Sequence, residues 1–352
     1  MTYIGVDLHK EQFTVCYRVT EGNETIREFD NGEEGISDFK QTLSCLDMVA
    51  VEAVGRARYF VKQIAPLVRK VVLVTPWKYA ILTTSIKKTD ANDARVLALG
   101  LEKDILPVAR LRTEAAHQVR ALLNARELLV AHRVRLMNVM ESIVANYGIK
   151  IPKLKLRYRN WRESVDVNQF AFGEYHAWLT LNDQMEAANS QIVNLERQIV
   201  DSSKQFESYG VLASVPGFGP ITVAHLLRTI DRIADFNNPK ALCSFLGIVP
   251  RTRQSAGHNL PSRKAGRYKS GAITRAGDSK TRSALIMAVN RVLVHNQSLR
   301  NFYDRVKGRR GYRKARTAAA RKLLTFLFFA LKKGKPIEAF EKIDFSKPHS
   351  AI

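Results

Sequence analysis

The sequence of 352 residues is poor in cysteine and in acidic residues, and it lacks a long apolar run. Its three cysteines, Cys16, Cys45 and Cys243, have no paired spacing, which argues against a zinc site and a disulfide framework and is typical of a reducing cytosol. No apolar run approaches the ~20 residues that cross a bilayer. The first residues are interrupted by charges, unlike a signal peptide. We therefore expect a cytoplasmic protein that is not embedded in a membrane.

Basic residues are in large excess over the scarce acidic ones. Lys and Arg total 56 against 33 Asp and Glu, for a formal net charge of +23. Nearly all of this excess lies in residues 251–335, which carry 23 basic residues and only two acids, Asp278 and Asp304. Such localised charge is typical of a surface that binds a phosphate backbone. Hydrophobic residues make up 45% of the chain, so a sizeable folded core is expected as well.

The first hundred residues alternate strand-like and helix-like segments. Three strand patterns come first and are followed by helix, strand, helix, strand and helix patterns. This order predicts an α/β unit built on a mixed sheet. The expected strands are 2–8, 13–19, 25–31, 47–54 and 70–76, and the expected helices are 34–46, 58–68 and 89–101.

The middle of the chain has the periodicity of long amphipathic helices. One heptad series runs through Leu122, Leu129, Leu136 and Ile143, and a second series with 3-4 spacing runs through Met185, Ala188, Ile192, Leu195 and Ile199. Both predict a helical hairpin or coiled-coil dimerisation arm, with a basic, aromatic insert between them. A mainly helical basic domain follows. The predicted divisions are 1–108, 109–207, 208–340 and a tail, 341–352.

Four acidic residues of the first unit stand out by their surroundings. Asp7 interrupts an apolar strand, and Glu52 does the same in the next buried strand. A carboxylate in such a place is costly unless a partner compensates it. Asp90 and Asp93 lie three residues apart, which places both on one face of a helix. We expect all four to converge at one edge of the sheet, where hard oxygen ligands would bind Mg²⁺ or Mn²⁺.

Each acid taken alone has a simpler explanation. Asp90 or Asp93 can cap a helix or interact with its dipole. Glu52 can pair with Arg56 or Arg58. As a set, their placement favours a metal site. Two ions held close together promote phosphodiester chemistry, because they activate the attacking oxygen and stabilise the leaving oxygen.

The pattern GVDLHK, VAVEAVG and KKTDANDARVLA resembles the RuvC-like (RNase H-like) domain of the insertion sequence 110 family of transposases, to which Piv-type DNA invertases are related. The C-terminal part resembles the transposase domain of the same family. The resemblance implies an Asp, Glu, Asp, Asp metal-binding tetrad, which falls on Asp7, Glu52, Asp90 and Asp93. It also implies an oligomer, a dimer or tetramer, that acts on double-stranded DNA. Many family members use a bridge RNA to choose their sites.

A basic loop that contains Ser255 is the second candidate site. Arg251 and Arg253 precede the serine, and each guanidinium can donate two hydrogen bonds to the oxygens of one phosphate. An unaided hydroxyl is a poor nucleophile, and an ordinary loop serine is the alternative from the residues alone. The family resemblance implies a serine nucleophile in this region, although the loop reads QSAG and is longer than usual. The fallback candidates are Ser262 and Ser270.

Together these features predict a DNA transposase or site-specific recombinase that works through a serine–phosphodiester intermediate, with metal bound by the acids. The alternative is a RuvC-like nuclease or junction resolvase, in which activated water replaces the serine. Further contacts to nucleic acid are expected at a helix-hairpin-helix-like turn, at a helix start and in the basic segment 307–316. The residues concerned are Gly217, Gly219, Lys280, Arg282, Arg309, Arg310, Arg313 and Lys314.

Overall fold

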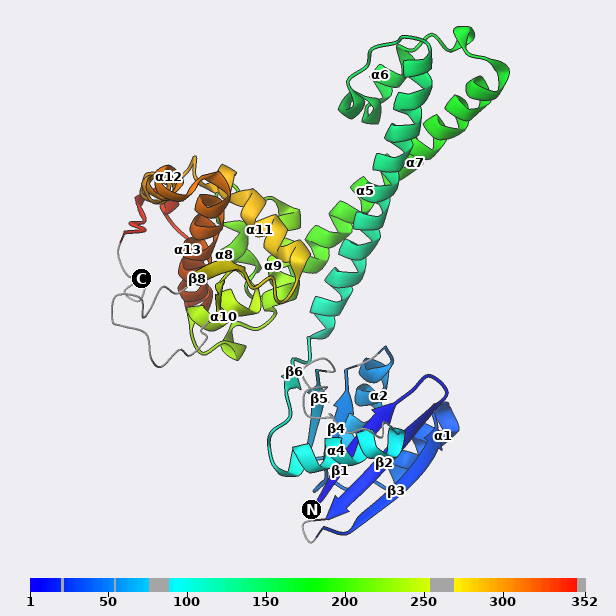
Figure 1. Ribbon diagram of the computed structural model, residues 1–352, viewed down its shortest axis with the longest axis vertical. Helices are drawn as coiled ribbons and strands as arrows, with labels where there is room; N and C mark the ends of the chain where they lie inside the picture. Colours follow the sequence, from blue (N-terminus) through cyan, green and yellow to red (C-terminus); the bar gives the residue numbers. More distant parts are fainter. Residues whose placement is uncertain (20–21, 54, 76–88, 254–268, 347–352) are drawn as a thin grey trace. The chain divides into compact units, whose positions relative to one another are not determined.

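The chain forms two compact units, Met1–Leu111 and Arg112–Ile352. The predicted helical region and the predicted basic domain both lie in the second unit, and the functional division between them stays a prediction. The computed structural model, drawn in Figure 1, describes residues 1–19, 22–53, 55–75, 89–253 and 269–346.

The first unit is built on a mixed sheet of six strands in the order β3-β2-β1-β4-β5-β6. Strands β1, β2 and β3 are antiparallel neighbours, whereas β4 and β5 run parallel to β1. This confirms the predicted α/β class. The short β6, which pairs antiparallel with β5, was not predicted. The strands are β1 (Thr2–Leu8), β2 (Gln12–Val19), β3 (Glu24–Asp30), β4 (Met48–Glu52), β5 (Lys70–Val74) and β6 (Val108–Ala109).

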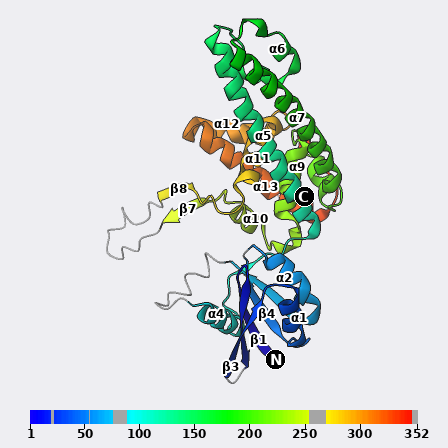
Figure 2. The same ribbon diagram turned by 90° about the vertical axis from the view of Figure 1, so that its right-hand side faces the viewer.

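Helices cover both faces of this sheet, as Figure 2 shows, with α4 on one side and α1 and α2 on the other. Alternation along β1 explains the two layers, because successive strand residues point to opposite faces. Ile4 and Val6 pack in the core beneath α1 and α2, whereas Gly5 lies against α4. The helices are α1 (Glu33–Gln41), α2 (Ala57–Ile64), a 3₁₀ turn η1 (Ala65–Leu67) and α4 (Asp90–Glu102).

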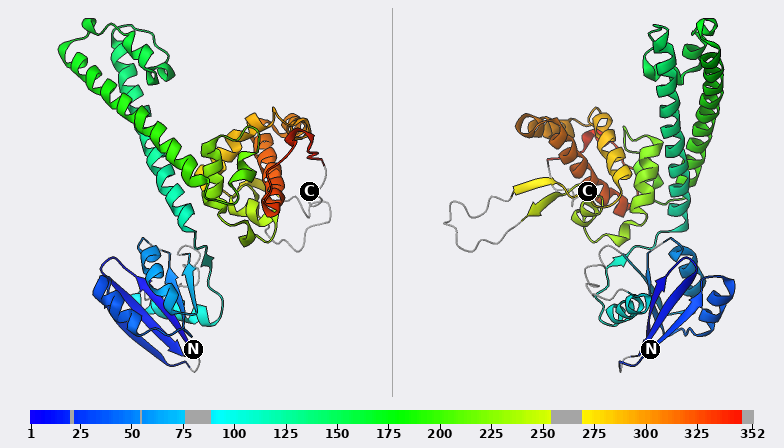
Figure 3. Two further views of the ribbon diagram at one scale, coloured as in Figure 1. Left: turned by 180° about the vertical axis from the view of Figure 1, so that it is seen from behind. Right: turned by 45° about the vertical axis from the view of Figure 1, so that its right-hand side comes forward.

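Two long helices of the second unit pack side by side over most of their length, as both views of Figure 3 show. They are α5 (Glu114–Asn146) and α7 (Phe172–Ser203). Leu136 and Met140 of α5 share an apolar core with Trp178 and Met185 of α7. The predicted hairpin of long amphipathic helices is therefore present. Whether it joins two copies of the chain stays a prediction.

The basic insert between these helices folds back on α7 through a buried arginine. Arg162 is only 1% exposed. Its Nε donates to Asn182 Oδ1 at 2.6 Å, its Nη1 donates to the Leu156 carbonyl oxygen at 2.8 Å, and its Nη2 pairs with Glu186. The positive charge of Arg162 thus stabilises the fold of the insert and is not available on its surface. The insert contains η2 (Lys153–Arg157), α6 (Arg159–Glu163) and η3 (Val167–Gln169).

The remaining helices form one apolar core together with the nearby ends of α5 and α7. At its centre lies α13, in which Leu323, Leu324 and Leu327 are fully buried, so the apolar part of this helix belongs to the core. None of the described helices is both long enough and apolar enough to cross a membrane. The elements are α8 (Tyr209–Ala213), α9 (Pro220–Ile230), η4 (Ile233–Asp235), α10 (Pro239–Phe245), β7 (Pro250–Arg253), β8 (Lys269–Ile273), α11 (Ser279–Val292), α12 (Gln297–Arg310), α13 (Tyr312–Lys333) and η5 (Phe340–Lys342).

A buried polar network joins α9 to the start of α11. Asp278 is the N-cap of α11, and its Oδ1 accepts from the backbone N–H groups of Lys280 and Thr281 at 2.9 Å each. Its Oδ2 accepts from Arg228 Nη2 at 2.7 Å. Because Arg228 is 2% exposed, Asp278 both caps the helix and neutralises a buried cation. One of the two acids in the basic region therefore has a structural role.

Candidate metal centre

Asp7 occupies the penultimate position of β1 and is only 4% exposed. Strand alternation places it on the same face of the sheet as Gly5, which is the face covered by α4. Its neighbours Val6 and Leu8 pack into the opposite, apolar layer. The fold therefore brings a carboxylate into a largely dry position between sheet and helix, where an ionised group needs compensation.

Glu52 follows at the corresponding end of the neighbouring parallel strand. The register pairs Val6 with Val51, so Asp7 and Glu52 come next on β1 and β4. Both face α4, because Ala50 packs in the same cluster as Leu97 of that helix. Adjacent strands lie about 4.8 Å apart. The carboxyl ends of parallel strands thus bring these two acids to one edge of the sheet, as the spacing in sequence predicted.

Asp90 and Asp93 both belong to the first turn of α4. The N-cap is Thr89, whose side chain accepts from the Asn92 N–H at 3.3 Å. The alternative that one of the aspartates caps this helix is therefore wrong, although both still benefit from the positive end of the helix dipole. The helix start carries two carboxylates to the face of the sheet where Asp7 and Glu52 end.

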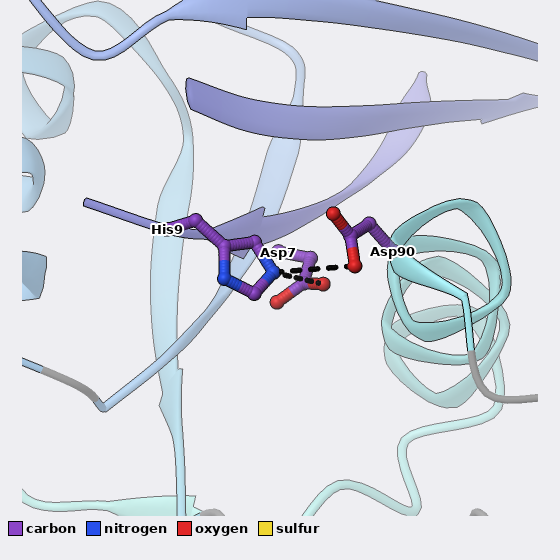
Figure 4. A group of neighbouring side chains, drawn as sticks. All are labelled: Asp7, His9 and Asp90. Atoms are coloured by element: carbon purple, nitrogen blue, oxygen red, sulfur yellow. Dashed lines mark hydrogen bonds and ion pairs between the residues drawn. The ribbon is translucent and has the colours of Figure 1, made fainter. Parts of the chain in front are cut away.

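His9, which sequence reasoning did not select, links two of these acids. Its Nε2 lies 3.1 Å from Asp7 Oδ2 and 3.4 Å from Asp90 Oδ1, as the dashed lines of Figure 4 show. The ligand atoms of Asp7, His9 and Asp90 all lie within 4.8 Å of one another. Among the described residues this is the one group with metal-ligand geometry; Glu52 and Asp93 are outside it. His9 lies just after β1, which ends at Leu8, and a single histidine there gives no spacing signal before the β1–β2 turn is known.

Burial and mutual repulsion set the electrostatics of the site. Burial raises the pKa of Asp7, and Asp93 and Asp90 add to the increase, while His9 opposes it. For His9, burial acts to lower the pKa, but the attraction of Asp7 and Asp90 outweighs it and the pKa is raised. Asp90 and Asp93 thus add negative potential around the buried Asp7 carboxylate, and His9 partly offsets it; a negative potential of this kind favours a bound cation.

The residues present fit a divalent ion. Carboxylate oxygens are ligands for Mg²⁺ and Mn²⁺, and an imidazole nitrogen is a ligand for transition-metal ions. Thr14 lies opposite Asp7 in the register of β1 and β2 and is fully buried. In the described part of the chain its Oγ1 has no hydrogen-bond partner. A buried hydroxyl without a partner beside a buried carboxylate is what a site leaves when an ion and its bound water are needed to complete it.

The serine candidates lie at or beyond the ends of β7 and β8. These strands pair antiparallel, with Arg253 opposite Lys269. Ser255 and Ser262 fall in 254–268, outside the described residues. Ser270 is part of β8, where its backbone is opposite Thr252. Arg251 is exposed and donates to the Thr274 carbonyl oxygen at 3.1 Å. The nucleophile therefore stays a prediction.

The predicted helix-hairpin-helix-like turn packs within the fold. Gly217 has φ +92°, and a Cβ there would lie 2.8 Å from the Arg291 carbonyl carbon and from the Val292 nitrogen. Close packing against α11 thus requires glycine at this position whether or not DNA is bound. Gly219 is the N-cap of α9 and is followed by Pro220. A phosphate contact at this turn stays a prediction.

One of the predicted nucleic-acid contacts needs correction. Arg282 is only 8% exposed, and its Nη1 donates to the carbonyl oxygens of Leu246 and Ala276 at 3.1 and 2.8 Å. It fastens α11 to the preceding segments and does not present its charge to a ligand. Lys280 is exposed and pairs with Glu127 of α5. The side chains that do project outward surround the junction of α12 and α13 at Gly311, and they are Arg309, Arg310, Arg313 and Lys314.

Comparison with known proteins identifies both parts of the chain with transposases. The model of the transposase IS116/IS110/IS902 family matches residues 209–304. A second transposase model, the DEDD domain of IS110 elements, matches residues 4–149 and so covers the acid-bearing unit.

Several curated proteins are similar over most of their length. The pilin gene-inverting protein of Moraxella lacunata is 26% identical over 353 residues, which cover 96% of this chain and 98% of that protein. The transposase for insertion sequence element IS1328 of Yersinia enterocolitica is 22% identical, over 81% of this chain and 82% of the relative. The transposase for insertion sequence element IS1111A of Coxiella burnetii is 22% identical, over 83% and 78%.

Proposed function

Because the chain belongs to the IS110 family of transposases, enzymes of DNA strand transfer, we propose that it cuts and rejoins DNA at a divalent metal held by its acidic residues. The ligands in this proposal are Asp7, Glu52, Asp90 and Asp93. The nucleophile is Ser255, which forms a covalent phosphodiester with one DNA strand. Mg²⁺ or Mn²⁺ is the proposed ion, since oxygen atoms dominate the donor set.

The observation that carries this proposal is the position of Asp7. It is a buried carboxylate whose neighbours include two further acids at the start of α4, while Glu52 ends the adjacent strand. A cluster of this kind is costly to a protein that does not use it. The DEDD transposase family model that matches residues 4–149 includes all four acids.

We further propose that the first unit is RNase H-like, as the family resemblance implies. The supporting observation is the sheet, in which three antiparallel strands come first and two parallel strands joined through helices follow. Asp7 on the first strand and Glu52 on the first parallel strand then end at the same edge. Metal chemistry at the carboxyl edge of a sheet is a common arrangement for α/β units.

The proposed reaction exchanges one phosphorus–oxygen bond for another. The Ser255 oxygen forms a bond to phosphorus while a phosphorus–oxygen bond of the DNA breaks; the serine loses its proton and the leaving DNA oxygen gains one. When bound, the ion supplies charge neutralisation at the phosphate and activation of the attacking oxygen. Arg251 and Arg253 hold phosphate oxygens in this scheme. Because the ester retains the energy of the broken bond, reversal rejoins the strand without ATP.

The partners in this proposal are double-stranded DNA, a structured guide RNA and further copies of the chain in a dimer or tetramer. The support is electrostatic: the segment 251–335 carries 23 basic residues against two acids, and Arg282 is the one of them already shown to be buried. The arginines at the junction of α12 and α13 are an exposed part of this charge.

A strand-cleavage assay tests the proposal. End-labelled DNA containing the element's junction is incubated with Mg²⁺ or Mn²⁺ and resolved on a denaturing gel. We expect a slow-migrating protein–DNA adduct that disappears in Ser255→Ala but persists in the matched variants Ser262→Ala and Ser270→Ala. Asp7→Asn should abolish cleavage while DNA binding survives. Cleaved DNA without an adduct would instead favour the hydrolytic RuvC-like nuclease, and cleavage by Asp7→Asn would refute the metal site.

A further inference from the structure

His9 presents one nitrogen to two carboxylates from different elements. Nε2 lies 3.1 Å from Asp7 Oδ2 on β1 and 3.4 Å from Asp90 Oδ1 on α4. Figure 4 shows the ring turned so that this single atom faces both oxygens. An imidazole N–H can point directly at only one acceptor. A single hydrogen bond therefore accounts for one of the two nearby carboxylates but not for both.

The same three atoms have the spacing of ligands around one ion. Donors bound at about 2.1 Å lie roughly 3.0 Å apart at neighbouring octahedral corners and roughly 3.4 Å apart in a tetrahedron. The 3.1 Å distance from His9 Nε2 to Asp7 Oδ2 is close to the octahedral value, and the 3.4 Å distance to Asp90 Oδ1 is somewhat longer than it. All three donor atoms also lie within 4.8 Å of one another, so their side chains are close enough to reach one ion after side-chain adjustment.

The backbone that carries His9 is fixed by neighbouring segments. Its N–H donates to the Gln12 carbonyl oxygen at 3.0 Å, which closes the β1–β2 turn. Its carbonyl oxygen accepts from Asn31 Nδ2 at 2.5 Å, and Asn31 N–H in turn donates to the Glu11 carbonyl oxygen at 2.8 Å. Asn31 is 2% exposed. A half-exposed ring on an anchored backbone is placed to meet an ion while keeping an open side for solvent or substrate.

We propose that His9 is a direct nitrogen ligand of the ion held by Asp7 and Asp90, and that the site therefore prefers Mn²⁺ to Mg²⁺. This inference rests on the proposed metal site and adds to its acidic ligands. Imidazole binds Mn²⁺ and later transition ions better than Mg²⁺, which favours oxygen donors and retained water. A site of acids alone would show this preference less strongly.

The test uses Mn²⁺ alone as the probe and the full-length protein. Pulsed electron paramagnetic resonance of bound Mn²⁺ detects magnetic coupling to a directly bound ¹⁴N nucleus. We expect this coupling in the wild type and in the control His295→Gln, whose histidine is exposed in the other unit. His9→Gln should lose it. Its Mn²⁺ dissociation constant should rise about tenfold or more, while that for Mg²⁺ should rise less than about threefold.

Thermal unfolding in EDTA checks that His9→Gln is folded, and the wild-type spectrum decides the matter independently of any variant. Bound Mn²⁺ that Asp7→Asn abolishes, but that shows no nitrogen coupling in the wild type, would overturn His9 as a ligand while leaving the acidic metal site intact. Mn²⁺ binding equal in the wild type and Asp7→Asn would overturn the acidic site and this inference together. Nitrogen coupling lost only in His9→Gln would establish the ligand.

Discussion

Gly5 lies directly against the backbone of Ala94: a Cβ at Gly5 would be 2.1 Å from the Ala94 carbonyl oxygen and 2.5 Å from the Ala98 nitrogen. Helix α4 therefore rests on β1 without an intervening side chain. Because Asp7 is two residues further along the strand and Asp90 begins the helix, this contact sets the separation of the two acids. The lack of a side chain at Gly5 therefore helps to set the geometry of the candidate metal centre.

Replacing Gly5 with alanine should push α4 away from the sheet. The methyl group has no space, so we expect the free energy of unfolding to fall by about 1–3 kcal/mol. Binding of Mn²⁺ should weaken as Asp90 moves from Asp7. Denaturant unfolding and metal titration measure the two effects. The control is Gly55→Ala, since no described atom lies within 4 Å of a Cβ there. Equal behaviour of the two variants would contradict the role of this contact.

Thr14→Val should affect stability and metal binding in opposite directions. In the described structure the buried Thr14 hydroxyl has no partner, so the near-isosteric valine should raise the metal-free stability by about 1 kcal/mol. If this hydroxyl contacts a water on the ion, Mn²⁺ affinity should fall in the same variant. Melting temperatures in EDTA and in Mn²⁺ give both signs. A variant that gains stability equally in both solutions would show that Thr14 has no part in the site.

His225 predicts a loss of stability in mild acid. Burial lowers its pKa to about 4, and the Arg228 guanidinium, whose Nη2 lies 3.4 Å from Nδ1, adds to the decrease, while Asp278 opposes it. The unfolded chain, with a pKa of 6.5, therefore binds the proton more readily. The neutral, buried His225 therefore adds its full contribution to the free energy of unfolding above pH 6.5. That contribution, about 3 kcal/mol, is lost as the pH falls toward 4.

Denaturant unfolding between pH 7 and pH 4 measures this slope in the wild type and in His225→Gln. Glu127, whose Oε1 lies 3.5 Å from Nε2, is retained in both proteins. The variant should be less stable at pH 7 and should lose less stability on acidification. Identical slopes in the two proteins would exclude His225 as the group responsible.

Arg282 and Arg313 should separate folding from nucleic-acid binding. Arg282→Ala removes the donor to the buried Leu246 carbonyl oxygen and to the Ala276 carbonyl oxygen, so stability should fall by roughly 1–3 kcal/mol with little change in the salt dependence of DNA binding. Arg313 is exposed, and Arg313→Ala should instead lower the slope of log K against log salt by about one. Titrations at several salt concentrations check both. A reduced slope for Arg282→Ala would reverse our correction.

The strands and helices of the first unit could be predicted from the local sequence. Alternating apolar residues and short apolar runs are typical of a sheet covered by helices on both faces. Asp7 and Glu52 were placed at one edge by the same logic, since parallel strands end together. His9 was missed because a single histidine after a strand carries no spacing signal until the β1–β2 turn is known. The exact approach of α4 was equally hidden, because the space at Gly5 depends on a helix that begins 85 residues later.

Charge in the second unit was overinterpreted for a different reason. Counting treats every arginine of 251–335 as surface, yet Arg282 is buried and bonded within the fold, as are Arg162 and Arg228 elsewhere in the same unit. Burial of a cation depends on partners from other helices, such as Asp278 for Arg228, and no local pattern reports it. The exposed arginines near Gly311 retain the predicted surface position.

The central claim is that the acidic residues around Asp7 hold a divalent ion. Its most direct test is an anomalous difference map from crystals of the protein soaked in Mn²⁺. We predict a peak at roughly 2.0–2.3 Å from carboxylate oxygens of both Asp7 and Asp90, absent in Asp7→Asn crystals. No peak there, at a Mn²⁺ concentration that supports DNA cleavage in solution, would contradict the account.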